Sequence, residues 1–249
     1  MINSLLNVTL APGDAIGFTF FIGYMSMFAA TVFFFLERQS VAEKWRLSLL
    51  VSGLITMIAS VHYYYMRDVY LTTGSSPIQF RYIDWILTVP LMCVEFYLLT
   101  KPYGAKTAVL TKMILYSLVM LVAGYYGEAF APTAANPGMH SIIWGIISTL
   151  GYVGIVYEVV AGDIAKLAKS SNDADLQNAI GLLRKFILIG WAIYPIGYMA
   201  MQGNLLSSII EPKNLDLIYN IGDAINKIGF GFVVYGLAKS ATAKSNAIA

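Results

Sequence analysis

Seven long apolar stretches alternate with short polar segments along this chain. A helix of about 20 apolar residues crosses a bilayer hydrocarbon core of about 30 Å, and each stretch is at least that long. They cover residues 13–37, 44–67, 78–100, 105–127, 138–162, 178–203 and 213–240. The pattern predicts an all-α membrane protein, a seven-transmembrane-helix bundle that forms a single domain over residues 1–249.

The amino-acid composition also indicates that the protein is embedded in lipid. Hydrophobic residues make up 58% of the chain and charged residues 12%, whereas soluble domains carry about 25% charged residues. A net charge of +2 is too small to indicate nucleic acid as a partner. Cys93 stands alone in an apolar run, which predicts a small buried thiol, and His62 and His140 are too far apart to suggest a zinc site. Residues 1–12 hold no basic residue, so no clear secretory signal is expected there, although a short cleaved leader is left open.

The lysines and arginines predict an orientation. Twelve of the sixteen follow the first, third, fifth and seventh stretches, whereas the opposite side has only Arg67 and Lys213. Cytoplasmic loops carry the excess of basic residues in membrane proteins. We therefore expect the N-terminus outside and the C-terminus in the cytoplasm.

Some charged residues fall well inside the predicted helices, where ionised groups are costly and usually functional. They are Arg81, Asp84, Glu95, Asp223 and Lys227. On the third stretch, Arg81, Asp84, Thr88 and Glu95 are separated by 3, 4 and 7 residues and share one helix face. Asp223 and Lys227 share a face of the seventh stretch, and Glu95 lies about 16 Å deeper toward the cytoplasm than Asp84.

Lys227 and His62 each allow two interpretations. A buried lysine forms a structural ion pair, here with Asp223 or Asp84, or it condenses as a neutral amine with an aldehyde. His62 lies at a depth similar to that of Asp84 and is close enough to hydrogen-bond to it. The alternative is a core histidine that bonds a backbone carbonyl.

Aromatic residues share one face of the sixth stretch. Trp191, Tyr194 and Tyr198 occupy positions 0, 3 and 7 of the sixth stretch, with Pro195 at mid-helix, and Trp85 follows Asp84. Such rigid walls suit a long, flat apolar ligand, although an aromatic stripe is also typical of core packing. A proline inside a membrane helix often marks a bend.

Three motifs resemble the microbial rhodopsins, with the proteorhodopsins as the nearest group: "RYIDWILTVPLMCVEFY" on the third stretch, "WAIYP" on the sixth and "DAINK" on the seventh. The resemblance covers essentially the whole chain, in the same order. It implies all-trans retinal bound covalently to Lys227 as a protonated Schiff base, with light-driven outward proton transport as the function.

The resemblance also implies roles for single residues. Asp84 matches the primary proton acceptor and counter-ion, Asp223 the second counter-ion and Glu95 the cytoplasmic proton donor. Arg81 matches the arginine outside the counter-ions, and His62 the histidine that partners the acceptor. Thr88 is positioned to orient Asp84 by a hydrogen bond. The retinal pocket is matched by Trp85, Trp191 and Tyr194, beside Pro195 and Tyr198.

Further positions refine these expectations. Acids at positions 84 and 95 favour a proton pump over a pump of chloride or sodium ions. They also favour a pump over a photosensor. Met92 occupies the colour-tuning position, where an apolar residue resembles the green-absorbing type. Phe21 stands where many relatives carry a tryptophan that faces a neighbouring protomer's histidine, so a contact of His62 across an oligomer interface is in doubt.

Gly145 aligns with a position where antenna-free pumps often carry a bulky aromatic residue. We therefore expect a cleft there that can seat a hydroxylated carotenoid, or else a glycine that serves helix packing. The resemblance also implies a pentamer or hexamer in the bacterial inner membrane. Glu128 and Glu211 are candidate release groups, but ordinary solvated acids are favoured, and Glu158 is expected to be an interfacial charge.

The alternative functions are a photosensory rhodopsin that signals to a partner, a pump of another ion, and a retinal-free ion-coupled transporter. Under every one of these interpretations the protein is a transporter or receptor rather than an enzyme.

Overall fold

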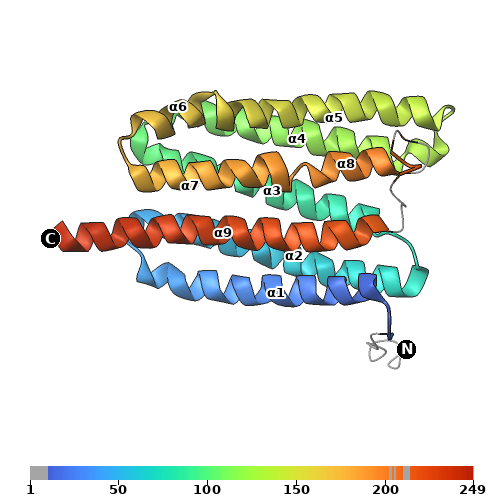
Figure 1. The fold of residues 1–249 in the computed structure, drawn as a ribbon, viewed down its shortest axis with the longest axis horizontal. Coiled ribbons are helices and arrows are strands. Elements are labelled where there is room, and N and C mark those ends of the chain that lie inside the picture. The colour runs from blue at the N-terminus through green and yellow to red at the C-terminus, as the bar shows by residue number, and fades with distance from the viewer. Residues whose placement is uncertain (1–10, 202–203, 205, 210–213, 249) are drawn as a thin grey trace.

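The protein is a bundle of long helices that lie side by side along one axis (Figure 1). The computed structural model describes residues 11–201, 204, 206–209 and 214–248, and these form helices without strands. The helices are α1 (Ala15–Glu37), α2 (Arg46–Thr73), α3 (Ile78–Thr100), α4 (Thr107–Ala129), α5 (Pro137–Val160), α6 (Asp163–Ser170), α7 (Ala174–Lys185), α8 (Ile193–Ala200) and α9 (Leu215–Ile248).

Local capping groups explain where several helices begin and end. The Asp14 carboxylate accepts a hydrogen bond from the Gly17 backbone N–H (2.9 Å) at the start of α1, and Asn136 caps α5 at Met139 (3.1 Å). Gly74 ends α2 with a φ of 67°, a conformation that glycine adopts at little cost. Because no earlier residue stops the helix, α2 continues to Thr73 instead of ending near residue 67.

The sixth predicted helix is interrupted. It begins at Ala174 rather than 178, because the Asp173 carboxylate caps the backbone N–H groups of Asp175 and Leu176. A π-helical segment, Phe186–Gly190, then separates α7 from α8. Pro195 lies inside α8 just beyond that segment. The helix is therefore irregular near Pro195, as the sequence suggests, but the break falls on its N-terminal side.

The bundle closes through α9. Consecutive helices from α1 to α5 pack against each other in sequence order, and α9 packs against α1, α2 and α7. Six of the described segments are long and apolar enough to cross a membrane, and α9 runs parallel to them (Figure 1). This helix carries Asp216, Asp223 and Lys227 in its first half.

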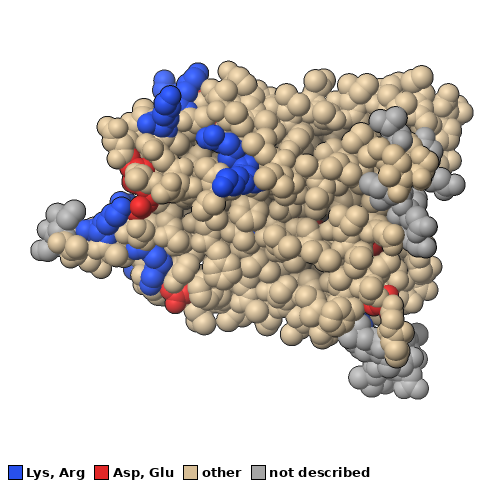
Figure 2. Space-filling view, in the orientation of Figure 1, with Lys and Arg blue, Asp and Glu red and all other residues tan. Residues whose placement is uncertain are grey.

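Large apolar side chains face outward along the middle of the bundle. On α5, Ile142, Ile146 and Leu150 are each more than half exposed, which suits contact with lipid. Lys and Arg on the face in Figure 2 gather at the end of the molecule where the C-terminus lies, and the middle of that face is almost free of charge. Cys93 is fully buried in the core, as expected.

Candidate cofactor pocket and proton path

Lys227 lies in the core of the bundle in contact with two acids. Its Nζ is 3.0 Å from Asp84 Oδ2 on α3 and 3.1 Å from Asp223 Oδ2 one turn earlier on α9. All three side chains are at most 3% exposed. The lysine therefore pairs with both carboxylates, where the sequence left the choice between them open. Such a buried charge cluster is stable only if its members balance one another.

The two carboxylates differ in their other contacts. Asp223 accepts hydrogen bonds from Tyr63 (2.7 Å), the Trp85 indole (3.1 Å) and Tyr194 (2.5 Å). The second oxygen of Asp84, Oδ1, is buried without a hydrogen-bond partner in the described chain. Three donors favour the charged form of Asp223, whereas Asp84 has only the Lys227 ammonium beside its carboxylate and is therefore the more readily protonated of the two. Tyr63 is not among the residues expected from the sequence.

Two contacts expected at Asp84 take another form. His62 Nδ1 donates to the Ile58 carbonyl of its own helix (2.8 Å), and no His62–Asp84 hydrogen bond is present in the described chain. The continuous helix through this region holds that carbonyl within reach of the ring. Thr88 Oγ1 donates to the backbone oxygen of Asp84 (2.8 Å) rather than to its carboxylate. Thr88 therefore steadies the helix turn that carries the acid.

Arg81 pairs with Asp216 on α9, and none of the ion pairs within the described chain joins it to Asp84. Its Nη2 is 2.6 Å from Asp216 Oδ1, and Ser76 Oγ donates to the same oxygen (2.8 Å). Both members of the pair are nearly buried, with side chains 2% and 10% exposed. Asp216 is not among the residues expected from the sequence, although its spacing on the seventh stretch was a usable signal. It lies seven residues before Asp223 and therefore on the same helix face.

Glu95 is fully buried on the opposite side of Lys227 from Arg81. Ser52 Oγ donates to Glu95 Oε1 (3.0 Å), and Oε2 has no partner in the part of the chain that is described. Ser52 was also missed. Ser48, Ser52 and Thr56 recur every four residues along apolar α2 and are all buried. That spacing was the available signal for a polar partner facing α3.

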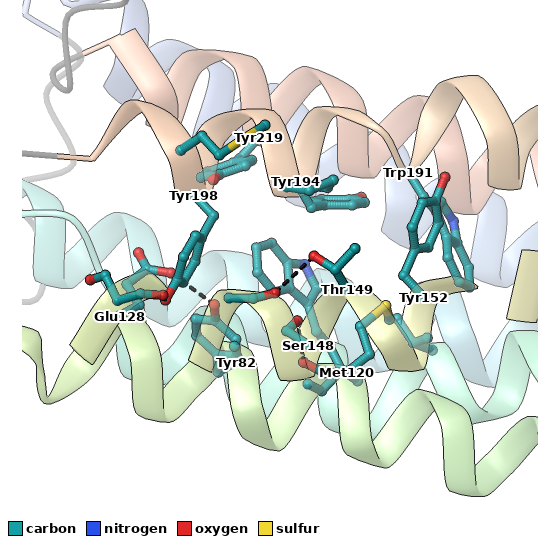
Figure 3. Close-up of a pocket in the computed structure, with 18 of the residues that line it drawn as sticks. Tyr82, Met120, Glu128, Ser148, Thr149, Tyr152, Trp191, Tyr194, Tyr198 and Tyr219 are labelled. Atoms are coloured by element: carbon teal, nitrogen blue, oxygen red, sulfur yellow. Dashed lines mark hydrogen bonds between the residues drawn. The ribbon is translucent and has the colours of Figure 1, made fainter. Parts of the chain in front are cut away.

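A cavity of about 780 Å³ adjoins Lys227. Its lining includes every residue predicted for the pocket: Met92, Trp85, Gly145, Trp191, Tyr194, Pro195, Tyr198 and Lys227. In Figure 3, Trp191, Tyr194 and Tyr198 lie along one side, and Met120 and Ser148 lie opposite. Trp85 and Tyr194 pack edge to face, 4.8 Å between ring centroids. A large, aromatic-walled cavity with an amine in its wall fits a polyene aldehyde such as retinal.

The ring of Tyr198 fills the space beside Gly145. Tyr198 donates a hydrogen bond to the Ser141 carbonyl (2.7 Å), and a Cβ at position 145 would lie 2.9 Å from Tyr198 Cε1. Ile142 and Ile146 line the same cavity and are also exposed on α5. The cavity thus extends to the outer surface of the bundle beside Gly145, but Tyr198 occupies the cleft expected there.

Glu128 was expected to be a solvated acid and Glu158 an interfacial charge, but both have partners within the protein. Glu128 accepts a hydrogen bond from Tyr82 (2.8 Å) and lines the cavity. Glu158 is 1% exposed, pairs with Lys112 (2.6 Å) and accepts from the backbone N–H of Asp163 (3.0 Å) at the start of α6. It is therefore a buried capping residue rather than an interfacial charge. Glu211 lies outside the described residues.

The chain is similar to several known proteins over most of its length. The family model described as Bacteriorhodopsin-like protein matches residues 14–241. The chain is 44% identical to the green-light absorbing proteorhodopsin of Gamma-proteobacterium EBAC31A08 over 92% of this chain and 88% of that protein. It is 45% identical to the blue-light absorbing proteorhodopsin of Gamma-proteobacterium Hot 75m4 over 90% and 86%.

Among solved structures, the chain is similar to xanthorhodopsin, described as a light-driven ion pump with dual chromophore. The TM-score is 0.80 at 29% identity, with 95% of this chain and 98% of that chain covered. The residues that the family model matches include Lys227. The chain is a multi-pass membrane protein and belongs to the bacteriorhodopsin-like family.

Proposed function

We infer that this protein is a light-driven outward proton pump with retinal attached to Lys227. The observation that carries the inference is the position of Lys227 Nζ, in the wall of the large cavity and in contact with both Asp84 and Asp223. Retinal, when bound, supplies light absorption, a change of shape, and a protonated Schiff base at the Lys227 nitrogen. The remaining work falls to side chains of the chain itself.

Asp84 is the proton acceptor in this proposal. Its Oδ2 is 3.0 Å from the Lys227 nitrogen, within direct transfer distance. Asp223 is at a similar distance, but three hydrogen-bond donors hold it as a fixed anion. Asp223 therefore balances charge as the second counter-ion, and Asp84 takes the proton.

Glu95 is the proton donor from the other side. It is fully buried about 16 Å along α3 from Asp84, estimated from the helix rise. Burial without a cation favours a neutral carboxyl group that holds a proton until the Lys227 nitrogen needs one. An acceptor on the Arg81 side and a donor on the other give transport in one direction.

Illumination of expressing cells tests the pump. Cells in unbuffered medium with all-trans retinal should acidify the medium in light, and a protonophore should abolish the change. Cells that express Lys227→Ala should be colourless and show no light response. A visible pigment without acidification, together with a slow photocycle, would favour a photosensor. If no visible absorption band formed when retinal was supplied, the result would favour a retinal-free transporter over both a pump and a photosensor that use retinal.

We also propose that a hydroxylated carotenoid binds beside Gly145. The exposed residues Ile142 and Ile146 in the cavity lining, and the similarity to xanthorhodopsin with its dual chromophore, support this idea. Tyr198 would have to turn away from Gly145. Zeaxanthin added to the purified protein should produce energy transfer to retinal in a fluorescence excitation spectrum, and Gly145→Phe should abolish it. No transfer in the unaltered protein excludes the antenna.

The proposed location is the inner membrane of a bacterium, with a pentamer or hexamer as the assembly. Gammaproteobacterial relatives support the location. Native mass spectrometry from lipid nanodiscs measures the number of copies directly. A monomer in every lipid composition would exclude the assembly.

A further inference from the structure

A second cavity lies at the end of the bundle where the C-terminus is found, far from Lys227 along the helices. Its volume is about 340 Å³, and it is formed by the end of α5, by α6 and by α7. The polar side chains in its lining are Lys166, Lys169, Gln177 and Arg184. Figure 2 shows Lys and Arg gathered on the surface over α6 and α7.

The cavity lining holds three cations and no acid. Neighbouring acids have other partners: Glu158 and Asp163 bind Lys112 at 2.6 and 2.9 Å. Asp173 accepts a hydrogen bond from Tyr103, and Asp175 pairs with Lys244. None of the ion pairs within the described chain involves Lys166, Lys169 or Arg184.

Arg184 contributes a guanidinium to this lining. Its side chain is only partly exposed, and its Nε has no hydrogen-bond partner within the described residues, as is also true of the other four arginines. The guanidinium is therefore one more cation beside the hollow that an added acceptor could satisfy. Two lysines and an arginine around one hollow are suited to an oxyanion, and arginine in particular binds phosphate oxygens.

The surroundings favour a lipid as the source of that oxyanion. Val160, which is 43% exposed, and Ala161 also line the cavity and continue the apolar outer face of α5. A phospholipid bound here would have its phosphate at the membrane surface and its acyl chains along α5. Basic pockets between membrane helices on the cytoplasmic side are suited to anionic headgroups. We propose that this cavity binds the phosphate of an anionic phospholipid; this is independent of the pump assignment.

Native mass spectrometry of the retinal-bound protein with added phosphatidylglycerol or phosphatidylcholine tests the proposal. One phosphatidylglycerol should bind in preference to phosphatidylcholine. The triple variant Lys166→Gln, Lys169→Gln, Arg184→Gln should weaken that binding at least about tenfold, since each cation near the surface contributes to anionic-lipid binding. An unchanged visible band in the variant shows that it is folded.

A matched triple variant controls for net charge. Lys101→Gln, Lys106→Gln and Lys185→Gln remove the same charge and none of these residues lines the cavity. Phosphatidylglycerol binding should stay within about twofold of the unaltered protein, because diffuse surface charge is weakly coupled to one site. Equal loss in both triple variants, or no preference for phosphatidylglycerol, would overturn the proposal. Displacement of the lipid by millimolar inorganic phosphate would assign the cavity to a soluble anion instead.

Discussion

Asp84 and Asp223 touch the same amine but are not equivalent. Both lie within 3.1 Å of Lys227 Nζ, yet Asp223 has three further donors and Asp84 Oδ1 has none in the described chain. Sequence spacing brings both acids to the lysine but cannot distinguish them, because the tyrosine and tryptophan donors come from α2, α3 and α8. The division of roles is therefore a property of tertiary contacts.

Glu95→Gln tests the donor at the residue scale. The variant should slow the late, reprotonation part of the photocycle by about 100-fold or more, the usual contribution of a positioned acid. The early transfer to Asp84 should change little, and added azide should partly restore the late rate. Flash photolysis measures both steps. Ser52→Ala is the matched variant, and its effect should be smaller because the carboxyl group remains. A late rate in Glu95→Gln equal to that of the unaltered protein would contradict the assignment.

Asp216→Asn tests the buried pair with Arg81. Loss of one partner leaves a buried cation uncompensated, which costs about 3–5 kcal/mol. The pigment should lose its colour at a clearly lower temperature. Asp175→Asn breaks the pair with Lys244, whose side chain is 62% exposed, and should cost under about 1 kcal/mol. Thermal bleaching of the visible band compares the two variants. Equal bleaching temperatures would show that the Arg81 pair does not stabilise the pigment.

At the scale of elements, glycine sets the distance between α4 and α5. A Cβ on Gly151 would lie 2.6 Å from both Met120 N and Tyr116 O, which are backbone atoms that cannot turn aside. Gly236 on α9 has no atom within 4 Å of such a Cβ. Small residues let membrane helices approach closely. Gly151 is therefore required for the close packing of α4 and α5, whereas nothing packs against the position of Gly236 in the described chain.

Gly151→Ala should therefore force α4 and α5 apart and destabilise the pigment by about 1–3 kcal/mol. Gly236→Ala should be neutral or stabilising by up to about 1 kcal/mol, because alanine favours the helix. Unfolding in mixed micelles of increasing dodecyl sulfate, followed at the visible band, gives the free energies. A stable Gly151→Ala with an unaltered spectrum would mean that the helices repack without cost.

The position of the break between α7 and α8 could not be predicted from the local sequence. Pro195 signals an irregular helix, but the π-helical segment lies at Phe186–Gly190. Asn226 on α9 donates to the Gly190 carbonyl (3.0 Å). A residue 36 positions away thus satisfies the backbone there, and such a contact has no local signature.

At the scale of the whole molecule, apolar length and motif order predict the fold almost completely. The bounds of α3 agree with those expected, since polar segments flank the stretch on both sides. All eight pocket residues line one cavity, because helical spacing fixes which residues share a face. Asp216, Ser52 and Tyr63 were missed, since polar residues paired across helices look ordinary within their own helices.

The distribution of charge makes a prediction about orientation. The end of the bundle near the C-terminus carries most of the basic residues, so that end should face the cytoplasm. A green fluorescent protein fused after Ala249 should be bright in bacterial cells, and alkaline phosphatase fused at the same place should be inactive. The reverse pattern would mean that the bundle has the opposite orientation in the membrane and that the direction of proton transport is reversed.

Cys93 is the single cysteine of the chain and is fully buried in the core. Thiol-reactive dyes and spin labels in water therefore have no native target on the folded pigment. New cysteines introduced at helix ends can be labelled one pair at a time without removing the natural residue. Distances between α7 and its neighbours can therefore be measured in light and in darkness with Cys93 left in place.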